Sequence, residues 1–411
     1  MPKKIVVTGI GATTPLGGTA TESWNALLAG ESGARTLEHD WVAELSLPVT
    51  FAAEAKVRPE DVLERVEYKR LDPSSQFALI SAREAWADAG SPDVDPERIG
   101  VDYSTGIGGL WTLLDAWDTL REKGPRRVLP MTIPMLMPNA AAAAISMAIP
   151  SRAYARTDVS ACASSTEALA NAYAHLQAGL ADVVIAGGTE AVVHPLPIAA
   201  FSSMQALSKR NDDPATASRP YDISRDGFVL GEGAATLVLE TEEHALARGA
   251  KIYAELAGGA VTSDSFHITA PDPEGTAAAR AVRDALEVAG ATPDQVTHIN
   301  AHATSTPVGD IAEYKALLRI FGEHLPNIPV SATKAATGHL LGGTGALEAI
   351  FTVLALYHRT APPTINLTEQ DPAIPLDVVT SPRDLGTGPQ LAISNSFGFG
   401  GHNAVAAFRS V

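Results

Sequence analysis

Short, uninterrupted runs of apolar residues recur along the chain and alternate with longer amphipathic segments. The runs at residues 5–7, 183–185 and 235–239 lack the polar alternation of a strand with one wet face. Apolar runs of this length are typical of strands that helices cover on both faces. Strands that alternate with helices in this way predict an α/β fold. Apolar positions at three-to-four spacing predict the helices, at residues 76–89, 167–178, 276–289, 310–321 and 345–357.

The same pattern opens twice in the chain. Residues 5–17 predict a strand that enters a loop of small residues, and after a short polar helix at 241–249 a new strand at 252–256 leads into two glycines. The similarity favours a duplicated fold with a boundary near residue 250. The length of 411 residues allows two or three domains and is compatible with this division.

Composition and charge remove several kinds of chemistry. Cys162 is the only cysteine, which excludes an intramolecular disulfide, zinc sites built on paired cysteines and iron–sulfur clusters held by four thiolates. The formal net charge of −17 argues against a surface that follows nucleic acid or anionic lipid. The uncharged stretch 134–150 is interrupted by Pro138 and is shorter than the roughly 20 apolar residues of a spanning helix. Glycine and proline interrupt residues 5–17 too early for a signal peptide, so we expect a cytoplasmic protein with no nucleic-acid or membrane partner.

Cys162 lies where a strand, a tight turn of small residues and a helix follow one another. A thiol at a helix N-terminus faces free N–H groups and the positive end of the helix dipole, which predicts a lowered thiol pKa. Its small neighbours Ala161, Ala163 and Ser164 leave room for a substrate. A buried structural cysteine is the competing interpretation.

Two of the 11 histidines occupy junctions of the same kind. His302 and His339 each follow a predicted strand and lie in a loop of small and hydroxyl residues. A fourth junction, residues 395–403, contains the glycine-rich segment Gly-Phe-Gly-Gly, whose backbone N–H groups can stabilise an oxyanion. Ligands of α/β sheets bind at the carboxyl ends of strands. We therefore expect one thiol, two imidazoles and this loop to meet at one edge of the sheet.

In these residues the chain resembles the beta-ketoacyl-acyl-carrier-protein synthases of bacterial fatty-acid synthesis, in particular their type II condensing enzymes. The resemblance runs from Val-Val-Thr-Gly-Ile-Gly at residues 6–11 to the Gly-Phe-Gly-Gly loop and covers essentially the whole chain. It implies the thiolase fold, in which two similar α/β halves form a five-layer αβαβα sandwich. The halves would be residues 1–250, with the nucleophilic cysteine, and 251–411, with both histidines and the glycine-rich loop. It also implies a homodimer and acyl carrier protein as partner, with substrates on its phosphopantetheine arm and no other cofactor.

The resemblance also implies a role for each matching residue. Cys162 would carry the acyl chain, His302 and His339 would stabilise the enolate formed when malonyl-acyl carrier protein loses carbon dioxide, and Lys334 would support the second histidine. The backbone N–H groups of Cys162 and Phe399 would form the oxyanion hole. The other implied positions are the gate at Gly398, Phe399 and Gly400, the phosphopantetheine tunnel at Thr269, Thr304 and Thr306, the acyl pocket at Ile107 and Phe201, carrier-protein docking at Lys69, Arg70, Arg126 and Arg127, and a monovalent-cation site at Asn300, Glu348 and Asn395.

Other functions fit the sequence less well. Two Gly-x-Gly segments suggest a nicotinamide enzyme, but the third glycine of the dinucleotide fingerprint is replaced by Thr14 in one and by Trp111 in the other. A non-decarboxylating thiolase needs a second active-site cysteine, and a chain-length factor of a polyketide synthase lacks the nucleophilic one. A condensing subunit of a type II polyketide synthase shares the Cys-His-His set and stays open as the alternative to fatty-acid elongation.

Overall fold

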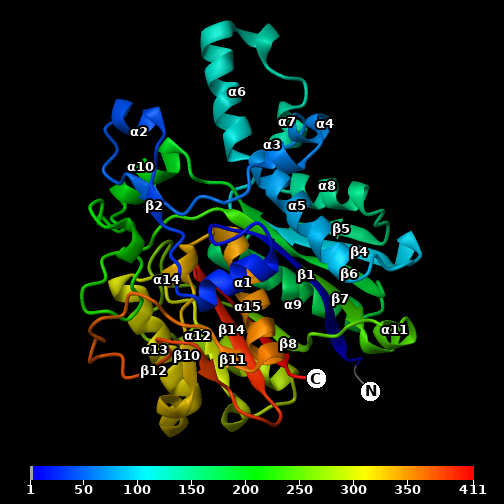
Figure 1. Ribbon diagram of the computed structural model, residues 1–411, viewed down its shortest axis with the longest axis vertical. Helices are drawn as coiled ribbons and strands as arrows, with labels where there is room; N and C mark the ends of the chain where they lie inside the picture. The colour runs from blue at the N-terminus through cyan, green and yellow to red at the C-terminus, as the bar shows by residue number, and fades with distance from the viewer. Residues whose placement is uncertain (1–2) are drawn as a thin grey trace.

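One mixed sheet of eleven strands forms the centre of the fold in the computed structural model, which describes residues 3–411 (Figure 1). In spatial order its strands are β12 (Asp377–Val378), β10 (Pro329–Ser331), β9 (His298–Asn300), β14 (Leu391–Gly398), β15 (His402–Arg409), β8 (Ala254–Ser263), β1 (Ile5–Thr13), β7 (Gly233–Thr241), β6 (Val183–Glu190), β4 (Ile99–Ser104) and β5 (Tyr154–Arg156).

The strand order repeats, which confirms the expected duplication. The first half runs β5-β4-β6-β7-β1 and the second, apart from its edge strand β12, runs β10-β9-β14-β15-β8. With β12 left out, each half uses its third, second, fourth, fifth and first strands in turn. Parallel and antiparallel pairings also agree strand by strand. The halves join where β1 pairs with β8 through Ile5–Leu256, Val6–Glu255 and Val7–Ala254. The two sheet layers are therefore one hydrogen-bonded surface.

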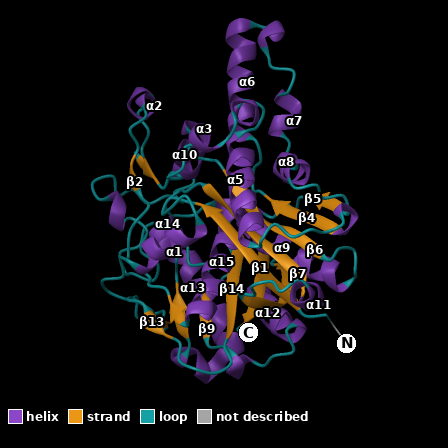
Figure 2. Ribbon diagram, turned by 45° about the vertical axis from the view of Figure 1, so that its right-hand side comes forward, coloured by secondary structure: helices purple, strands orange, loops and turns teal. Residues whose placement is uncertain are grey.

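The helices complete a five-layer sandwich. Helices α9 (Ser164–Gln177) and α15 (Thr344–His358) contact strands of both halves and form the middle layer, while α5 (Pro73–Asp88) with α8 (Ala140–Ala148) covers the first half from outside. Helix α12 (Thr276–Val288) covers the second half and packs against α13 (Pro307–Phe321). Helix α6 (Leu110–Lys123) projects from this body (Figures 1 and 2).

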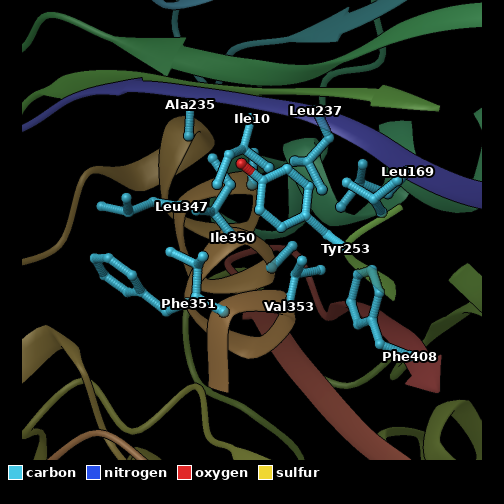
Figure 3. Close-up of a cluster of buried hydrophobic side chains, with 14 of the residues drawn as sticks. Ile10, Leu169, Ala235, Leu237, Tyr253, Leu347, Ile350, Phe351, Val353 and Phe408 are labelled. Atoms are coloured by element: carbon cyan, nitrogen blue, oxygen red, sulfur yellow. The ribbon is translucent and has the colours of Figure 1, made fainter. Parts of the chain in front are cut away.

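The main hydrophobic core surrounds α15. Figure 3 shows Leu347, Ile350 and Phe351 of this helix among side chains from β1 and β7. Phe408 of β15 contributes to the same cluster from the second half. Every residue of α15 from Thr344 to Leu356 is buried, because sheet layers lie on both of its sides.

Close packing of helices on strands explains the Gly-x-Gly segment at the N-terminus. A Cβ atom on Gly9 or Gly11 would lie 2.2 Å from the carbonyl oxygen of Ala85 or Ser81 in α5, far inside contact distance. In the second half, a Cβ on Gly258 would lie 2.7 Å from the carbonyl of Ala285 in α12. These glycines therefore allow a helix to touch a strand backbone, and the two halves use the same device.

Three helices begin three residues earlier than apolar spacing predicts. Helices α5, α9 and α13 start at Pro73, Ser164 and Pro307. Asp72 and Thr306 cap two of them by accepting a backbone N–H, and proline is well suited to the first helical turn. Capping residues and proline in the first turn are not part of the apolar spacing, so the spacing does not predict where these helices begin.

Shorter elements fill the remaining surface, and no helix within residues 3–411 is both long and apolar enough to cross a membrane. They are α1 (Ala20–Leu28), α2 (Asp40–Glu44), α3 (Pro59–Val62), α4 (Arg65–Tyr68), α7 (Thr132–Leu136), α10 (Pro195–Ser203), α11 (Glu242–Ala247), α14 (Lys334–Thr337), the pair β2 (Arg35–Thr36) and β3 (Phe51–Ala52), the pair β11 (Thr360–Ala361) and β13 (Arg383–Asp384), and the 3₁₀ turns η1 (Pro96–Arg98), η2 (Pro125–Arg127), η3 (Ala161–Ala163), η4 (Pro214–Thr216), η5 (Pro293–Gln295), η6 (Gly322–Asn327) and η7 (Leu341–Gly343).

Candidate active site

Cys162 lies in a strained turn directly before α9. Ala161 adopts a left-handed conformation with φ of 51°, and the turn η3 then leads into the helix. The glycine-rich hairpin between β14 and β15 reaches down to this turn. A Cβ on Gly398 would lie 2.7 Å from the carbonyl oxygen of Ser160 and 3.0 Å from the nitrogen of Cys162, so a larger residue would hold the hairpin away.

Burial dominates the chemistry of the thiol and contradicts the expected lowering of its pKa. Burial raises the pKa of Cys162 to about 11, although the backbone N–H of Phe399, the charge of Lys334 and the N–H of Cys162 itself act in the opposite direction. Desolvation outweighs these favourable contacts because the side chain is only 8% exposed. The resting group is therefore the thiol, surrounded by donors that favour negative charge when it develops.

The two predicted histidines face one another. Their ring centroids are 5.6 Å apart and their planes are nearly perpendicular, at 85°. Burial lowers both pKa values well below the ordinary range, Lys334 lowers them further, and His339 adds to the effect on His302. Both imidazoles are therefore neutral near pH 7. Nδ1 of His302 and Nε2 of His339 have no hydrogen-bond partner among residues 3–411, whereas Nδ1 of His339 has one.

Two residues that the sequence analysis missed hold these histidines. Glu313, buried in α13, accepts the backbone N–H of His302 at 2.9 Å and of Ala303 at 2.7 Å. Thr344, the first residue of α15, hydrogen-bonds Nδ1 of His339 through its hydroxyl at 2.9 Å. A carboxylate on the buried side of a helix was the one available signal for Glu313.

Lys334 forms a buried ion pair instead of contacting a histidine ring. Its Nζ donates to Oε1 of Glu348 at 2.6 Å, and both side chains are 1% exposed. Burial raises the pKa of Glu348 to about 7, and Lys334 opposes that shift. Lys334 therefore favours the ionised form of Glu348, and its positive charge favours the neutral form of the nearby histidines.

Replacement of Lys334 by methionine is expected to destabilise the fold by about 3–5 kcal/mol, because a buried carboxylate loses its cation. Without Lys334 the pKa of Glu348 in the folded protein is higher still. Because a carboxyl with a raised pKa in the folded state favours folding only while it is protonated, the folded protein becomes less stable as pH rises. Denaturant unfolding of K334M is expected to show a smaller deficit at pH 5 than at pH 8. The double variant K334M/E348Q is the control and should recover stability at pH 8; a deficit that does not change with pH contradicts this account.

A single cavity of about 580 Å³ connects most of the predicted site. Cys162, His302 and His339 line it together with Gly398 and Phe399. Gly400 does not line it; with φ of 84° it shapes the turn behind Phe399. The predicted tunnel and acyl-pocket positions that also line the cavity are Ile107, Phe201, Thr269, Thr304 and Thr306.

Three buried oxygens near the ion pair accept no hydrogen bond from any of the residues 3–411. They are Oδ1 of Asn300, Oε2 of Glu348 and Oδ1 of Asn395, and each of these residues is at most 1% exposed. Oxygen ligands from amides and a carboxylate suit a hard cation. The residues predicted for a monovalent cation therefore present three oxygen atoms without a donor, which is the ligand type of hard cations.

The predicted docking residues lie at the surface, away from these buried groups. Lys69 follows α4, Arg70 comes next, and Arg126 and Arg127 belong to η2. All four are exposed, and none forms an ion pair with another of the residues 3–411. Their charges are available to a partner.

A duplicated αβαβα sandwich with a buried thiol, two neutral imidazoles and an N–H-lined loop at the carboxyl ends of strands defines an acyl-transferring enzyme of the thiolase fold. Comparison with known proteins gives the family. The beta-ketoacyl synthase N-terminal domain matches residues 2–245, and the C-terminal domain matches residues 253–368. The chain therefore belongs to the beta-ketoacyl synthase family.

Relatives with assigned names share nearly the whole length. The chain is 45% identical to 3-oxoacyl-[acyl-carrier-protein] synthase 2 of Mycobacterium tuberculosis (strain ATCC 25618 / H37Rv), covering 98% of this chain and 96% of the relative. It is 44% identical to the protein of that name from Synechocystis sp. (strain ATCC 27184 / PCC 6803 / Kazusa), covering 99% and 98%.

Solved structures share the fold throughout. A beta-ketoacyl synthase from Burkholderia phymatum STM815 is 38% identical with a TM-score of 0.91, and both chains are covered completely. The ketosynthase AntDE, solved with its type II polyketide synthase acyl-carrier protein AntF and bound to the hexaketide, is 32% identical with a TM-score of 0.91 and the same coverage.

Proposed function

We propose that the protein condenses malonyl-acyl carrier protein with an acyl chain held on Cys162, giving 3-oxoacyl-acyl carrier protein in fatty-acid elongation. The observation that carries this proposal is one cavity lined by Cys162, His302, His339 and Phe399. The 44–45% identity to 3-oxoacyl-acyl-carrier-protein synthases supports elongation over polyketide synthesis, since the polyketide ketosynthase AntDE is 32% identical. A polyketide ketosynthase is the second candidate.

In the first half-reaction the thiol of Cys162 attacks the thioester carbonyl of acyl-acyl carrier protein. The new C–S bond replaces the bond to the phosphopantetheine sulfur, which leaves with the proton that Cys162 gives up. The N–H groups of Cys162 and Phe399 stabilise the oxyanion of the tetrahedral intermediate. These N–H groups need no rearrangement during the reaction, because the close approach of Gly398 to the cysteine turn already holds them in place.

In the second half-reaction His302 and His339 bind the thioester oxygen of the malonyl group. Loss of carbon dioxide leaves the electron pair of the broken C–C bond as an enolate, whose oxygen charge the two neutral imidazoles stabilise as donors. The enolate carbon attacks the acyl carbonyl on Cys162, a C–C bond forms, and the C–S bond breaks. The sulfur leaves as a thiolate, which takes up a proton from water and restores the thiol. A neutral imidazole suits this step, because an imidazolium would lose its proton to the enolate more readily.

Acyl carrier protein and a second copy of the chain complete the proposed assembly in the cytoplasm. Lys69, Arg70, Arg126 and Arg127 offer exposed positive charge to an acidic carrier protein. A homodimer is supported by β5, which is an unpaired edge of the large sheet, and by exposed apolar residues such as Trp117 and Ile133, 53% and 63% exposed.

Two further parts of the proposal concern the interior of the protein. A monovalent cation would be held by three residues of the second half, Asn300, Glu348 and Asn395, and would offset negative charge there. A division into residues 1–250 and 251–411 is supported by α11, which ends at Ala247, and β8, which begins at Ala254.

Replacement of Cys162 by glutamine tests the separate roles of the thiol and the imidazoles. We expect C162Q to lose condensation completely but to decarboxylate malonyl-acyl carrier protein, because the side-chain amide fills the acyl-enzyme position while His302 and His339 are unchanged. Carbon dioxide release and 3-oxoacyl product are measured on the same sample. A folded C162Q protein that has lost both activities contradicts the proposed roles.

A further inference from the structure

Glu190 is a buried carboxylate beneath the cavity to which the mechanism above gives no role. It is the last residue of β6 and is completely buried. No lysine or arginine among residues 3–411 forms an ion pair with it. Burial raises its pKa to about 7, against the hydrogen bonds that it accepts. Burying a carboxylate without a cation costs free energy, so the contacts that it makes must offset this cost.

The carboxylate joins two loops that lie far apart in the sequence. Oε1 accepts the hydroxyl of Thr105 at 2.9 Å and the N–H of Ile107 at 3.2 Å. Oε2 accepts the N–H of Gly106 at 2.8 Å and the N–H of Gly342 at 3.0 Å. One oxygen atom therefore holds a backbone group from each loop.

The meeting of these loops requires glycine on both sides. A Cβ on Gly342 would lie 2.2 Å from the nitrogen of Gly106, and a Cβ on Gly106 would lie 2.7 Å from Oε2 of Glu190. With any side chain at either position, the two N–H groups could not share the oxygen. The local backbone is thus built around the Glu190 carboxylate.

Each loop carries one part of the reaction. Ile107 lines the cavity, at a position that the family resemblance assigns to the acyl pocket. Gly342 is the third residue after His339, and Leu341 between them also lines the cavity in a left-handed conformation with φ of 43°. At its other end this loop is fixed, because His339 exchanges backbone hydrogen bonds with Val229 and Gly231 at 2.8 and 2.9 Å. Glu190 is therefore the restraint that connects the loop to the acyl side.

We propose that Glu190 is a positioning residue that couples the acyl-pocket wall at Ile107 to the loop of His339. An acyl chain that displaces Ile107 displaces Glu190, which in turn displaces Gly342 and so the imidazole of His339, which donates to the malonyl thioester oxygen. The inference rests on the proposed condensation. Glu190 thereby limits the length of the acyl chain and links acylation of Cys162 to decarboxylation of the malonyl group.

Replacement of Glu190 by glutamine tests this link with little change in volume. The glutamine NH₂ group must face N–H donors on one side, so either the Ile107 contact or the contacts of Gly106 and Gly342 are lost. Condensation is measured with a ladder of acyl-carrier proteins. We expect E190Q to change the ratio of kcat/KM between the longest and shortest accepted chains by about tenfold, the scale of one methylene in a pocket.

Amide exchange is measured in parallel, before and after acylation of Cys162. In the wild type, acylation should alter exchange at residues 105–108 and 340–343 together, and in E190Q at the first segment alone.

The control is Glu84→Gln. Glu84 also accepts two backbone N–H groups, from Ala12 and Ala20, and burial raises its pKa to about 7, but it does not line the cavity. E84Q should leave the chain-length ratio unchanged. If E190Q slows all chain lengths equally, or if both segments still respond to acylation, the coupling is refuted. A wild-type protein that condenses no acyl chain refutes the proposed function instead, so the two failures are distinguishable.

Discussion

Replacement of Cys162 by alanine is expected to abolish acyl-enzyme formation and to lower the condensation rate by on the order of 10⁶-fold, the loss that follows removal of a nucleophile in other acyl-transfer enzymes. Cys162 is the only cysteine of the chain, so no second thiol can replace it. Its turn is shaped by Ala161 and Gly398, and neither contact depends on the sulfur. C162A should therefore keep its fold.

Mass spectrometry of the intact protein measures this prediction. After incubation with acyl-acyl carrier protein, the wild type should gain the mass of one acyl group, and peptide mapping should place it on Cys162. C162A should gain none. An acyl group that persists in C162A, or that maps elsewhere in the wild type, contradicts the assignment of the nucleophile.

Replacement of either His302 or His339 by alanine is expected to lower decarboxylation of malonyl-acyl carrier protein by about 10²–10³-fold, the cost of losing one oxyanion donor in a preorganised site. Acylation of Cys162 should be affected much less, because the oxyanion of that step is held by backbone N–H groups. Neither imidazole of the wild type should take up a proton between pH 6 and 8, since burial and Lys334 lower both pKa values.

The exposed His324 supplies a matched control. H324A removes an imidazole outside the cavity and should decarboxylate and condense at the wild-type rate. Carbon dioxide release gives the decarboxylation rate and intact mass gives the acylation rate of each variant. Protonation of either ring between pH 6 and 8, followed by NMR of the imidazoles, or H302A and H339A variants with undiminished decarboxylation, would exclude neutral histidine donors.

The fold was largely predictable because its physical signals are local. Apolar runs at β1, β6 and β7 indicate strands covered on both sides, and five amphipathic segments correspond to α5, α9, α12, α13 and α15. The similar openings before Gly9 and Gly258 already indicated duplication. The single sheet was not predictable, because it depends on the pairing of β1 with β8 across the halves.

The candidate site was predictable in its members but not in its energetics. Strand-loop-helix junctions brought attention to Cys162, His302 and His339, since carboxyl ends of strands gather at one edge of a sheet. The direction of the Cys162 pKa shift was predicted wrongly, because the helix N-terminus is visible in the sequence and the degree of burial is not. Glu313 and Thr344 were missed for the same reason, as each acts through one contact with a distant loop.

The sequence by itself determined which groups can react: one thiol, no second cysteine, two histidines at strand ends and a glycine-rich loop. These follow from residue type and local spacing, which folding does not alter. Only the tertiary structure decided the states of these groups. Burial keeps the thiol protonated and the imidazoles neutral, and Lys334 meets Glu348 only in the folded chain. Desolvation and charge pairing depend on what surrounds a group from every side, and a linear sequence shows only what precedes and follows it.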